Sequence, residues 1–231
     1  MTAVISITTI PDRIEHIGPC IRSLVKQGLP VYLWVVKKID RSNTTLKRIP
    51  PYLYKLGVNV EIVEDRGPIT KLLPALEAGF EIILTADDDR FYGPGWAKGL
   101  IKWSNVYPQA AIGYRGRILH KSRKYSRSRV VLSPKAPKRV DIITGCRGAL
   151  YRSELFDKSI FEDWKHWPRN DDIVISSHLK RRGVQLMIVH CKAKTKPTLA
   201  YKIQPLFGQN AHGKNLNDEG LRRMSWKKND G

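Results

Sequence analysis

The chain has 231 residues, 42% of them hydrophobic and 27% charged, and this composition excludes collagen-like, low-complexity and wholly disordered proteins. Its 41 Lys and Arg against 21 Asp and Glu give a formal net charge of +20, which indicates a polyanionic partner such as nucleic acid, an acidic membrane surface or an acidic glycan. Three widely spaced cysteines, a first segment unlike a signal peptide and apolar runs far short of the roughly 20 residues that cross a bilayer lead us to expect a soluble, cytoplasmic protein.

The first half of the chain alternates strand-like and helix-like segments. Short β-branched or apolar runs predict strands at residues 3–8, 31–36, 58–63 and 80–85. Apolar residues at helical spacing predict a helix between residues 14 and 25, which Gly18 and Pro19 delay or kink. Because strands joined by helix-length connections form βαβ units, we expect a mostly parallel α/β sheet flanked by helices.

The second half begins with a strongly basic segment. Residues 114–140 contain ten Lys or Arg and no Asp or Glu, which indicates a basic loop or ribbon. Beyond it we expect strands at 140–144, 149–151 and 185–189, a glycine-bracketed turn at 145–148 and a helix over 171–182. The tail beyond Lys192, rich in Lys, Asn and Gly, predicts loop. Since we find no internal repeat and no dividing linker, we expect a single domain.

Two polar clusters follow predicted strands, at residues 8–13 and 87–89. Ligands of parallel sheets collect beyond the carboxyl ends of the strands, so both clusters should face one crevice. The second cluster, Asp87-Asp88-Asp89, sets three carboxylates side by side, and a divalent cation that bridges to phosphate oxygens would relieve their repulsion. The alternative is a solvated acidic turn that caps the helix expected near 94–105.

Five segments, in this order along the chain, resemble the nucleotide-sugar glycosyltransferases of the GT-A fold, family 2-like in type. They are TTIPDR, EDRGPITKLLPAL, TADDDRFYGPGW, TGCRGALYR and NDDIVISSHL. The resemblance implies a Rossmann-like catalytic domain over residues 1–191, in which an Asp-x-Asp motif holds a metal against the sugar diphosphate. Residues 1–113 would form the nucleotide-sugar half, 114–140 a basic insert and 141–191 the acceptor half, followed by a basic tail at 192–231.

The resemblance also implies which residues bind the donor and the metal. The nucleotide sugar, by preference a UDP-sugar, would lie against Thr8, Pro11, Arg13, Asp65, Lys71, Asp87 and Asp88. The metal, Mn²⁺ or Mg²⁺, would lie on Asp87 and Asp89, with His190 or His212 as a further ligand. The alternatives are that Asp65 begins a turn at Gly67, that Lys71 is a solvated helix residue and that each histidine is structural or solvent-facing.

The late acidic pair Asp171-Asp172 follows Asn170 at the start of a predicted helix. Capping could account for all three residues, because Asn is a favoured N-cap and acidic side chains suit the first helical turn. The resemblance implies instead that Asp172, or else Asp171, is the general base that deprotonates the acceptor hydroxyl in an inverting transfer.

The net positive charge is larger than the resemblance implies, because a nucleotide-sugar transferase needs only a few cations at the phosphates of its donor. Ten basic residues lie in 114–140 and nine more follow from Lys192 onward. The aromatic residues Tyr125, Tyr201 and Trp226 are interleaved with them. Such runs either track a phosphate backbone or form a solvated face without a partner. The residues that we expect to bind the acceptor are Arg115, Arg117, Lys121, Arg123, Lys124, Arg127, Arg129 and Arg147.

The sequence therefore predicts a metal-dependent hexosyl- or pentosyltransferase that acts on a hydroxyl of a polyanionic acceptor. A hydroxylated base of DNA, such as a hydroxymethyl base, fits the charge best. A compact enzyme of this kind would suit a virus or phage that modifies its own genome. Two alternatives stay open: the acceptor is a glycan, a lipid-linked sugar or a protein, or the chain is a non-catalytic nucleic-acid-binding protein on a degenerate GT-A fold.

Overall fold

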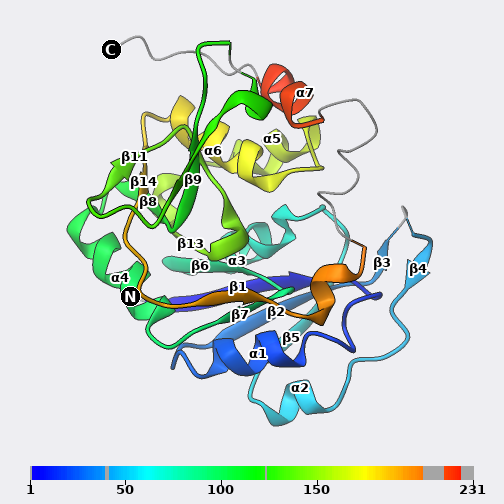
Figure 1. The fold of residues 1–231 in the computed structure, drawn as a ribbon. Coiled ribbons are helices and arrows are strands. Elements are labelled where there is room, and N and C mark those ends of the chain that lie inside the picture. Colours follow the sequence, from blue (N-terminus) through cyan, green and yellow to red (C-terminus); the bar gives the residue numbers. More distant parts are fainter. Residues whose placement is uncertain (1, 40–41, 123, 205–215, 225–231) are drawn as a thin grey trace.

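Four parallel strands form one half of the central sheet. The structure is a computed structural model that describes residues 2–39, 42–122, 124–204 and 216–224 (Figure 1). β1 (Ala3–Thr9) pairs in parallel with β2 (Val31–Val36) and β6 (Ile82–Asp87), and β2 pairs in parallel with β5 (Asn59–Val63). The four strands predicted from apolar runs are thus confirmed, with small shifts at their ends.

The other half of the sheet is mixed in direction. Its strands are β8 (Ala110–Gly113), β11 (Lys138–Arg139), β13 (Ala149–Arg152) and β14 (Gln185–Ile188). β13 runs antiparallel to β6 and β8, whereas β14 runs parallel to β8. The order across the sheet is β11-β14-β8-β13-β6-β1-β2-β5, which confirms the predicted mostly parallel α/β sheet.

Helices cover both faces of this sheet. They are α1 (Gly18–Val25), α2 (Tyr52–Lys55), α3 (Leu73–Glu77), α4 (Trp96–Val106), α5 (Ile160–His166), α6 (Asp171–Arg181) and α7 (Leu216–Arg223). Side chains of β1 alternate between two hydrophobic clusters, so that Val4 belongs to the cluster that contains Ile173 of α6, while Ile5 and Ile7 belong to the one that contains Leu24 of α1. Figure 1 shows α1 and α2 on one side of the sheet and α5 and α6 on the other. The helix α1 begins at the Gly-Pro pair, which confirms the predicted delay.

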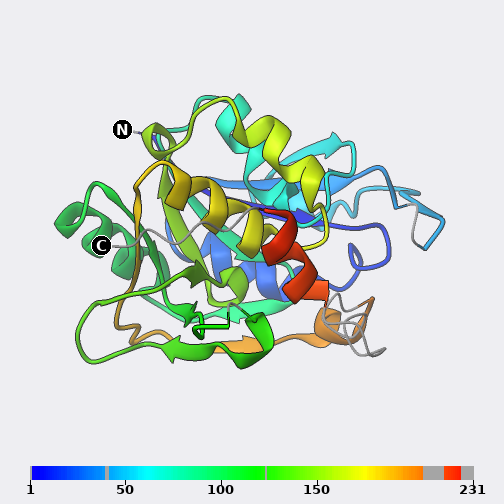
Figure 2. The ribbon, with the colours of Figure 1, turned by 90° about the horizontal axis from the view of Figure 1, so that it is seen from above.

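The basic segment forms a ribbon, one of its two predicted forms. β9 (Arg115–Ile118) pairs antiparallel with β10 (Arg129–Leu132) and with β12 (Ile142–Ile143). The connection contains the 3₁₀ helix η2 (Tyr125–Arg127), which packs against α7. Ser126 N and Oγ donate hydrogen bonds of 3.2 and 3.1 Å to Asp218 of α7. Figure 2 shows the green ribbon and the red helix α7 side by side.

The described parts of the tail, residues 192–204 and 216–224, contain regular structure where the composition predicts loop. β15 (Thr195–Pro197) pairs antiparallel with β7 (Arg90–Tyr92), and η5 (Leu199–Lys202) and α7 follow. A strand of three residues shows no periodicity in the sequence, so only its pairing with β7 reveals it. Thr198 N donates a 2.8 Å hydrogen bond to the carbonyl of Asp89, which ties the tail to the acidic triplet. Trp226 lies outside the described residues.

The remaining elements are short. β3 (Lys38–Ile39) and β4 (Thr44–Thr45) form a hairpin beyond β2. The 3₁₀ helices η1 (Ile69–Lys71), η3 (Gly145–Arg147) and η4 (Ser153–Leu155) lie in connections. Within the described ranges, no helix combines the length and the apolar character that a membrane span requires.

Candidate active site

A cavity of about 1020 Å³ opens beyond the carboxyl ends of β1 and β6, where the sequence predicts a crevice. Each of the five segments that carry the family resemblance contributes to its lining. The predicted site residues that line it are Thr8, Arg13, Asp65, Lys71, Asp87, Asp88, Asp89, Arg115, Arg117, Arg147, Asp171 and Asp172. Residues from both halves of the chain therefore meet in one place.

The first two carboxylates of the acidic triplet have close partners of their own. Asp87 Oδ1 accepts a 2.6 Å hydrogen bond from Lys71 Nζ. Asp88 is buried and accepts hydrogen bonds of 2.6 Å from Thr9 Oγ1 and 2.7 Å from Arg13 Nη1. The helix α4 takes no side-chain cap, so the alternative in which the triplet caps this helix is wrong.

Asp89 is the carboxylate of the triplet that has only longer ion pairs among the described residues, one of them between its Oδ2 and Arg13 Nη1 at 3.9 Å. Its Oδ1 is buried and has no hydrogen-bond partner among the described residues, although Nε of Arg90 lies 3.6 Å away. Burial and the negative charges of Asp87 and Asp88 raise the pKa of Asp89 to about 7, against the opposing charge of Arg13. A buried carboxylate oxygen without a donor suits a divalent cation, which prefers hard oxygen ligands.

Side chains of the protein would supply only part of the shell of a cation at Asp89. In the part of the chain that the structure describes, no group of three or more His, Cys, Asp or Glu side chains is arranged to hold a metal ion. Mg²⁺ characteristically binds one or two carboxylates and takes further oxygens from water and substrate phosphates, and Mn²⁺ prefers the same ligands. Asp89 and Asp87 line the same cavity, so together they fit a divalent cation. The oxygens of a diphosphate would then complete the coordination shell of that cation.

Lys71 joins the two acidic segments of the cavity. Its side chain is 6% exposed, and Nζ lies 2.6 Å from Asp87 Oδ1 and 2.9 Å from Asp171 Oδ2. Burial would lower the pKa of Lys71, but the charges of Asp171 and Asp87 outweigh it and hold that pKa well above its usual value. Ser6 Oγ also donates a 2.6 Å hydrogen bond to the Lys71 carbonyl. Lys71 is therefore a buried counter-ion, and the alternative of a solvated helix residue is wrong.

Replacing Lys71 with Met should destabilise the fold, because Asp87 and Asp171 would lose the cation that they share. Breaking a buried ion pair costs about 3–5 kcal/mol, which chemical denaturation at neutral pH would measure as a loss in the free energy of unfolding. The matched control is Lys165→Met, since Lys165 pairs with Glu162 on the surface at 2.7 Å and such pairs contribute about 0–1 kcal/mol. Equally small losses in both variants would contradict the role of Lys71.

Asn170 caps α6, and the two aspartates that follow it lie in the first helical turn, as the capping explanation expects, but each also has a partner outside the helix. Asn170 Oδ1 accepts a 3.2 Å hydrogen bond from Ile173 N, which confirms its predicted place as the N-cap of α6. Asp171 pairs with Lys71, and Asp172 bonds to the loop at η3. Both carboxylates therefore belong to the cavity.

The loop at η3 holds the carboxylate of Asp172. Gly145 N donates a 2.7 Å hydrogen bond to Asp172 Oδ1. Gly148 ends this loop with φ 97°, and a Cβ there would collide with the ring of Trp96, so the position requires glycine. Burial and the charge of Asp171 raise the pKa of Asp172 to about 7. A carboxylate with this pKa can accept a proton near neutral pH.

Thr8 and Asp65, both predicted to bind the nucleotide, line the cavity and also fix its backbone. Thr8 Oγ1 donates a 3.0 Å hydrogen bond to the carbonyl of Trp34. Asp65 Oδ1 accepts a 2.8 Å hydrogen bond from Gly67 N, which confirms the turn expected in the alternative. A role at the nucleotide stays a prediction for both residues.

Arg13 forms hydrogen bonds that join separate segments of the protein. Its Nη1 donates to Asp88 Oδ1 at 2.7 Å, and its Nε donates to the carbonyl of Ile203 at 2.8 Å. The side chain therefore joins the loop after β1 to the acidic triplet and to the tail. The positive charge of Arg13 still borders the cavity, and its place near the ribose or the diphosphate of a donor stays a prediction.

Some predicted site residues stand away from the cavity. Pro11 and His190 are not among the residues that line it. His190 is exposed, and its Nδ1 lies 3.4 Å from the carbonyl of Ser133. His212 and Arg123 lie outside the described residues. The structure thus does not bring His190 to the acidic triplet, and the role of His212 as a metal ligand stays a prediction.

Another part of the lining combines aromatic and cationic side chains. The guanidinium of Arg117 lies over the ring of Tyr125, 4.3 Å from its centroid, and Arg115 Nη1 donates a 3.2 Å hydrogen bond to Thr144 Oγ1. Residues that the sequence prediction missed complete this part, namely Trp164, Trp167, Arg169 and Asn217. Trp164, Trp167 and Arg169 shortly precede the acidic pair of α6 in the sequence. Their closeness to that pair is the feature of the sequence that could have identified them.

The remaining predicted acceptor residues lie on the outside of the ribbon. Lys121, Lys124, Arg127 and Arg129 are exposed and do not line the cavity. Because residues 114–140 contain no Asp or Glu, their charges are not neutralised within the segment. The ribbon therefore presents positive charge to solvent beside the cationic part of the cavity.

Comparison with solved structures establishes the fold. No protein-family profile and no curated protein matches the sequence. The crystal structure of GalNAc-T7 with UDP, GalNAc and Mn²⁺ is similar to this chain, with a TM-score of 0.62 over 97% of the chain and 12% sequence identity. The chain spans 48% of the length of that protein, about half. At this identity the likeness concerns the fold, and it confirms the predicted GT-A-like architecture.

Proposed function

We propose that this protein is a metal-dependent glycosyltransferase that transfers a sugar from a UDP-sugar to the hydroxyl of a hydroxylated base in DNA. The observation that carries the proposal is the meeting of two acidic segments in one cavity, where Asp87 and Asp171 share Lys71 while Asp89 and Asp172 have raised pKa values. GalNAc-T7, which has a similar fold, is bound to UDP, GalNAc and Mn²⁺, and this supports a sugar-nucleotide donor for the present chain.

The acidic triplet and its surroundings suit such a donor. Asp89 and Asp87 would hold Mn²⁺ or Mg²⁺, and a cation there offsets the charge that develops on the departing diphosphate. Arg90 Nε lies 3.6 Å from Asp89 Oδ1 and adds positive charge to the same lining. Thr8 and Asp65 offer a hydroxyl and a carboxylate that can orient the ribose or the base.

Asp172 would serve as the general base. Its carboxylate takes the proton of the acceptor hydroxyl while the acceptor oxygen bonds to the anomeric carbon and the bond from that carbon to the diphosphate breaks. Attack opposite the leaving group inverts the anomeric centre and releases UDP. Asp171 is the weaker candidate, because its Oδ2 already binds Lys71 Nζ at 2.9 Å.

The other part of the cavity suits a planar, anionic acceptor. Arg115 and Arg117 supply positive charge, and Tyr125 and Trp164 supply flat aromatic faces. Guanidinium groups pair with phosphates and aromatic rings stack on bases, so a nucleotide fits this lining better than a neutral glycan does. A purely binding protein would gain nothing from carboxylates such as Asp172 beside a polyanion, because they repel phosphate. The activity would suit a virus or phage that modifies its own genome.

Incubation with Mn²⁺, candidate nucleotide sugars and oligonucleotides tests the proposal. DNA that carries hydroxymethylated bases should gain the mass of one hexose or pentose per modified base, measured by mass spectrometry of the nucleosides, whereas unmodified DNA should not. Efficient transfer to a small sugar in preference to any DNA would contradict the acceptor but not the transferase. Failure of every donor with every acceptor would contradict the enzyme itself.

A ribbon variant serves as a control for the acceptor in the same assay. Replacing Lys121, Lys124 and Arg129 with Gln should raise the KM for DNA, and the slope of log K against log salt should flatten by about 0.9 for each phosphate that the variant no longer neutralises. A comparison variant removes the same charge from exposed lysines outside the ribbon and the cavity, namely Lys47, Lys55 and Lys158. Equal effects of the two variants would show that net charge, and not the ribbon, determines the affinity.

A further inference from the structure

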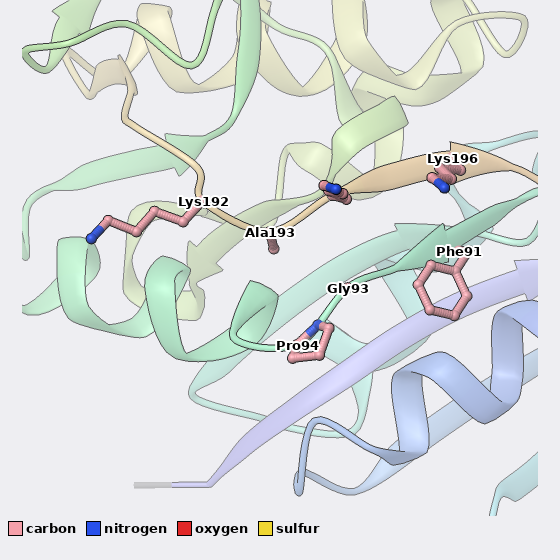
Figure 3. A pocket seen from close by; sticks show the side chains of 7 residues that line it. Phe91, Gly93, Pro94, Lys192, Ala193 and Lys196 are labelled. Atoms are coloured by element: carbon pink, nitrogen blue, oxygen red, sulfur yellow. The ribbon is translucent and has the colours of Figure 1, made fainter.

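A second, smaller cavity of about 470 Å³ lies along β7 and the segment that leads into β15. We call it the lysine groove, and its lining residues are Phe91, Gly93, Pro94, Lys192, Ala193, Lys194 and Lys196 (Figure 3). None of these residues lines the larger cavity. Figure 3 shows Lys192 toward one end of the groove and Lys196 above Phe91 toward the other. The groove is therefore a separate surface feature that the proposed reaction does not use.

The backbone sets the three lysines in a row. Exposure alternates along residues 192–196, so that the lysines are exposed and the residues between them are half-buried. Of the three lysines only Lys196 lies in the strand β15, since the chain bends at Ala193 before the strand begins. Gly93 N donates a 2.8 Å hydrogen bond to the carbonyl of Lys194, and a Cβ on Gly93 would lie 2.9 Å from that oxygen. Gly93 therefore lets the lysine-bearing segment pack directly on the end of β7.

An exposed aromatic ring accompanies this row. Phe91 pairs with Lys196 in the register of β7 and β15, and 41% of its surface is exposed. Its neighbours in β7 face the other way, because Arg90 lines the larger cavity and Tyr92 is buried. Residues 90–108 and 190–204 contain no Asp or Glu, so neither segment that forms the groove carries charges to neutralise the lysines.

The lysine groove leads toward the larger cavity along the chain. Beyond Lys196, Thr198 N bonds to the Asp89 carbonyl at 2.8 Å, and Tyr201 lines the larger cavity with the guanidinium of Arg90 5.2 Å from its ring centroid. Figure 1 shows the orange strand β15 passing across the molecule to η5. A linear ligand that followed the lysines would therefore be directed to the proposed active site.

We propose that the lysine groove binds an unpaired strand of nucleic acid, with phosphates against Lys192, Lys194 and Lys196 and one base stacked on Phe91. Three exposed cations along one groove fit the successive phosphates of a strand, and an exposed ring offers a stacking face to any base. A duplex fits less well, because its bases are already stacked within the helix. This surface goes beyond the proposed function, since it concerns binding and does not require sugar transfer.

Binding of fluorescent oligothymidylate over a range of salt concentrations, without nucleotide sugar, tests this proposal. Replacing Lys192, Lys194 and Lys196 together with Gln should flatten the slope of log K against log salt by about 2, since each neutralised phosphate on a single strand contributes about 0.7. Phe91→Ala should weaken binding by roughly 5- to 150-fold at every salt concentration, which is the effect of losing one stacked base, and should leave the slope unchanged.

The control variant replaces Lys47, Lys55 and Lys158 with Gln, which removes the same charge from exposed sites outside both cavities. A slope that flattens equally in the two triple variants would overturn the lysine groove as a binding site. A Phe91→Ala variant that binds oligothymidylate as tightly as the parent, or that loses as much affinity for a blunt duplex, would overturn the stacked base. Because these measurements involve no donor, their outcome does not depend on whether the protein transfers a sugar, so failure of the groove and failure of the proposed function can be told apart.

Discussion

Replacing Asp172 with Asn is expected to lower kcat by a factor on the order of 10² to 10⁴ and to leave the affinity for the UDP-sugar nearly unchanged. The amide oxygen can still accept the 2.7 Å hydrogen bond from Gly145 N, but an amide cannot take the proton of the acceptor hydroxyl. The loss falls on kcat because donor binding involves no proton transfer. Steady-state kinetics with saturating donor and acceptor measure it.

A helix-capping variant provides the matched control for this prediction. Asn170→Ala removes the hydrogen bond to Ile173 N at the start of the same helix and should lower the free energy of unfolding by about 1 kcal/mol. Turnover should persist in that variant, because the proton acceptor stays in place. If Asp172→Asn behaved in the same way, with a small loss of stability and nearly parental turnover, Asp172 would be structural only.

The pH dependence gives an independent readout of Asp172. Because its pKa is raised to about 7, the parental enzyme should gain activity as the pH rises through that value, and the Asp172→Asn variant should lose this dependence. The same shift has a consequence for stability. The folded protein holds this proton more tightly than the unfolded chain, so the stabilisation is fully present below the usual carboxyl pKa near 4 and is lost as the pH rises through about 7.

The fold could be predicted where the local pattern matched the final environment. Strands buried on both faces, such as Val31–Val36, are apolar along their whole length, and the helix α6 begins with a recognisable cap at Asn170. The tail could not be predicted, because β15 contains Lys196 and Pro197 and has only three residues. Its strand character comes from pairing with β7, which is information that lies about a hundred residues away in the sequence.

The sequence predicts which segments form the candidate site, but it does not predict which of their side chains contact one another. The clusters after β1 and β6 meet because parallel strands end at one edge of the sheet. That Lys71 would bind Asp87 and Asp171 depends on tertiary packing, since a lysine that follows Gly67 and Pro68 is equally compatible with solvent. The lining residue Trp164 was missed for the same reason, because a tryptophan in a short helix is usually part of the core.

Asp89→Asn is expected to abolish turnover while preserving the fold. The buried Oδ1 of Asp89 has no hydrogen-bond partner among the described residues, and the ion pairs of Asp89 with Arg90 and Arg13 are long, at 3.6 and 3.9 Å, so the substitution costs little and removes one of three crowded negative charges. The matched control is Asp88→Asn, because Asp88 accepts hydrogen bonds from Thr9 and Arg13 and its loss should lower the free energy of unfolding. Denaturation and activity measurements on both variants should thus separate an inactive, stable protein from a destabilised one.

The loss of turnover in Asp89→Asn should result from the loss of metal binding. Two aspartates supply too few oxygens for the complete coordination shell of a divalent cation. Mn²⁺ alone should therefore bind weakly, and UDP should strengthen its binding by supplying phosphate oxygens. Linkage requires that Mn²⁺ strengthen UDP binding by the same factor, which calorimetric titrations in both orders would measure. A chelator should stop turnover, excess Mn²⁺ should restore it, and the Asp89→Asn variant should show no coupling between Mn²⁺ and UDP. Turnover that survives exhaustive chelation, or coupling that persists in the variant, would show that the reaction neutralises its leaving group through cationic side chains such as Arg90 instead.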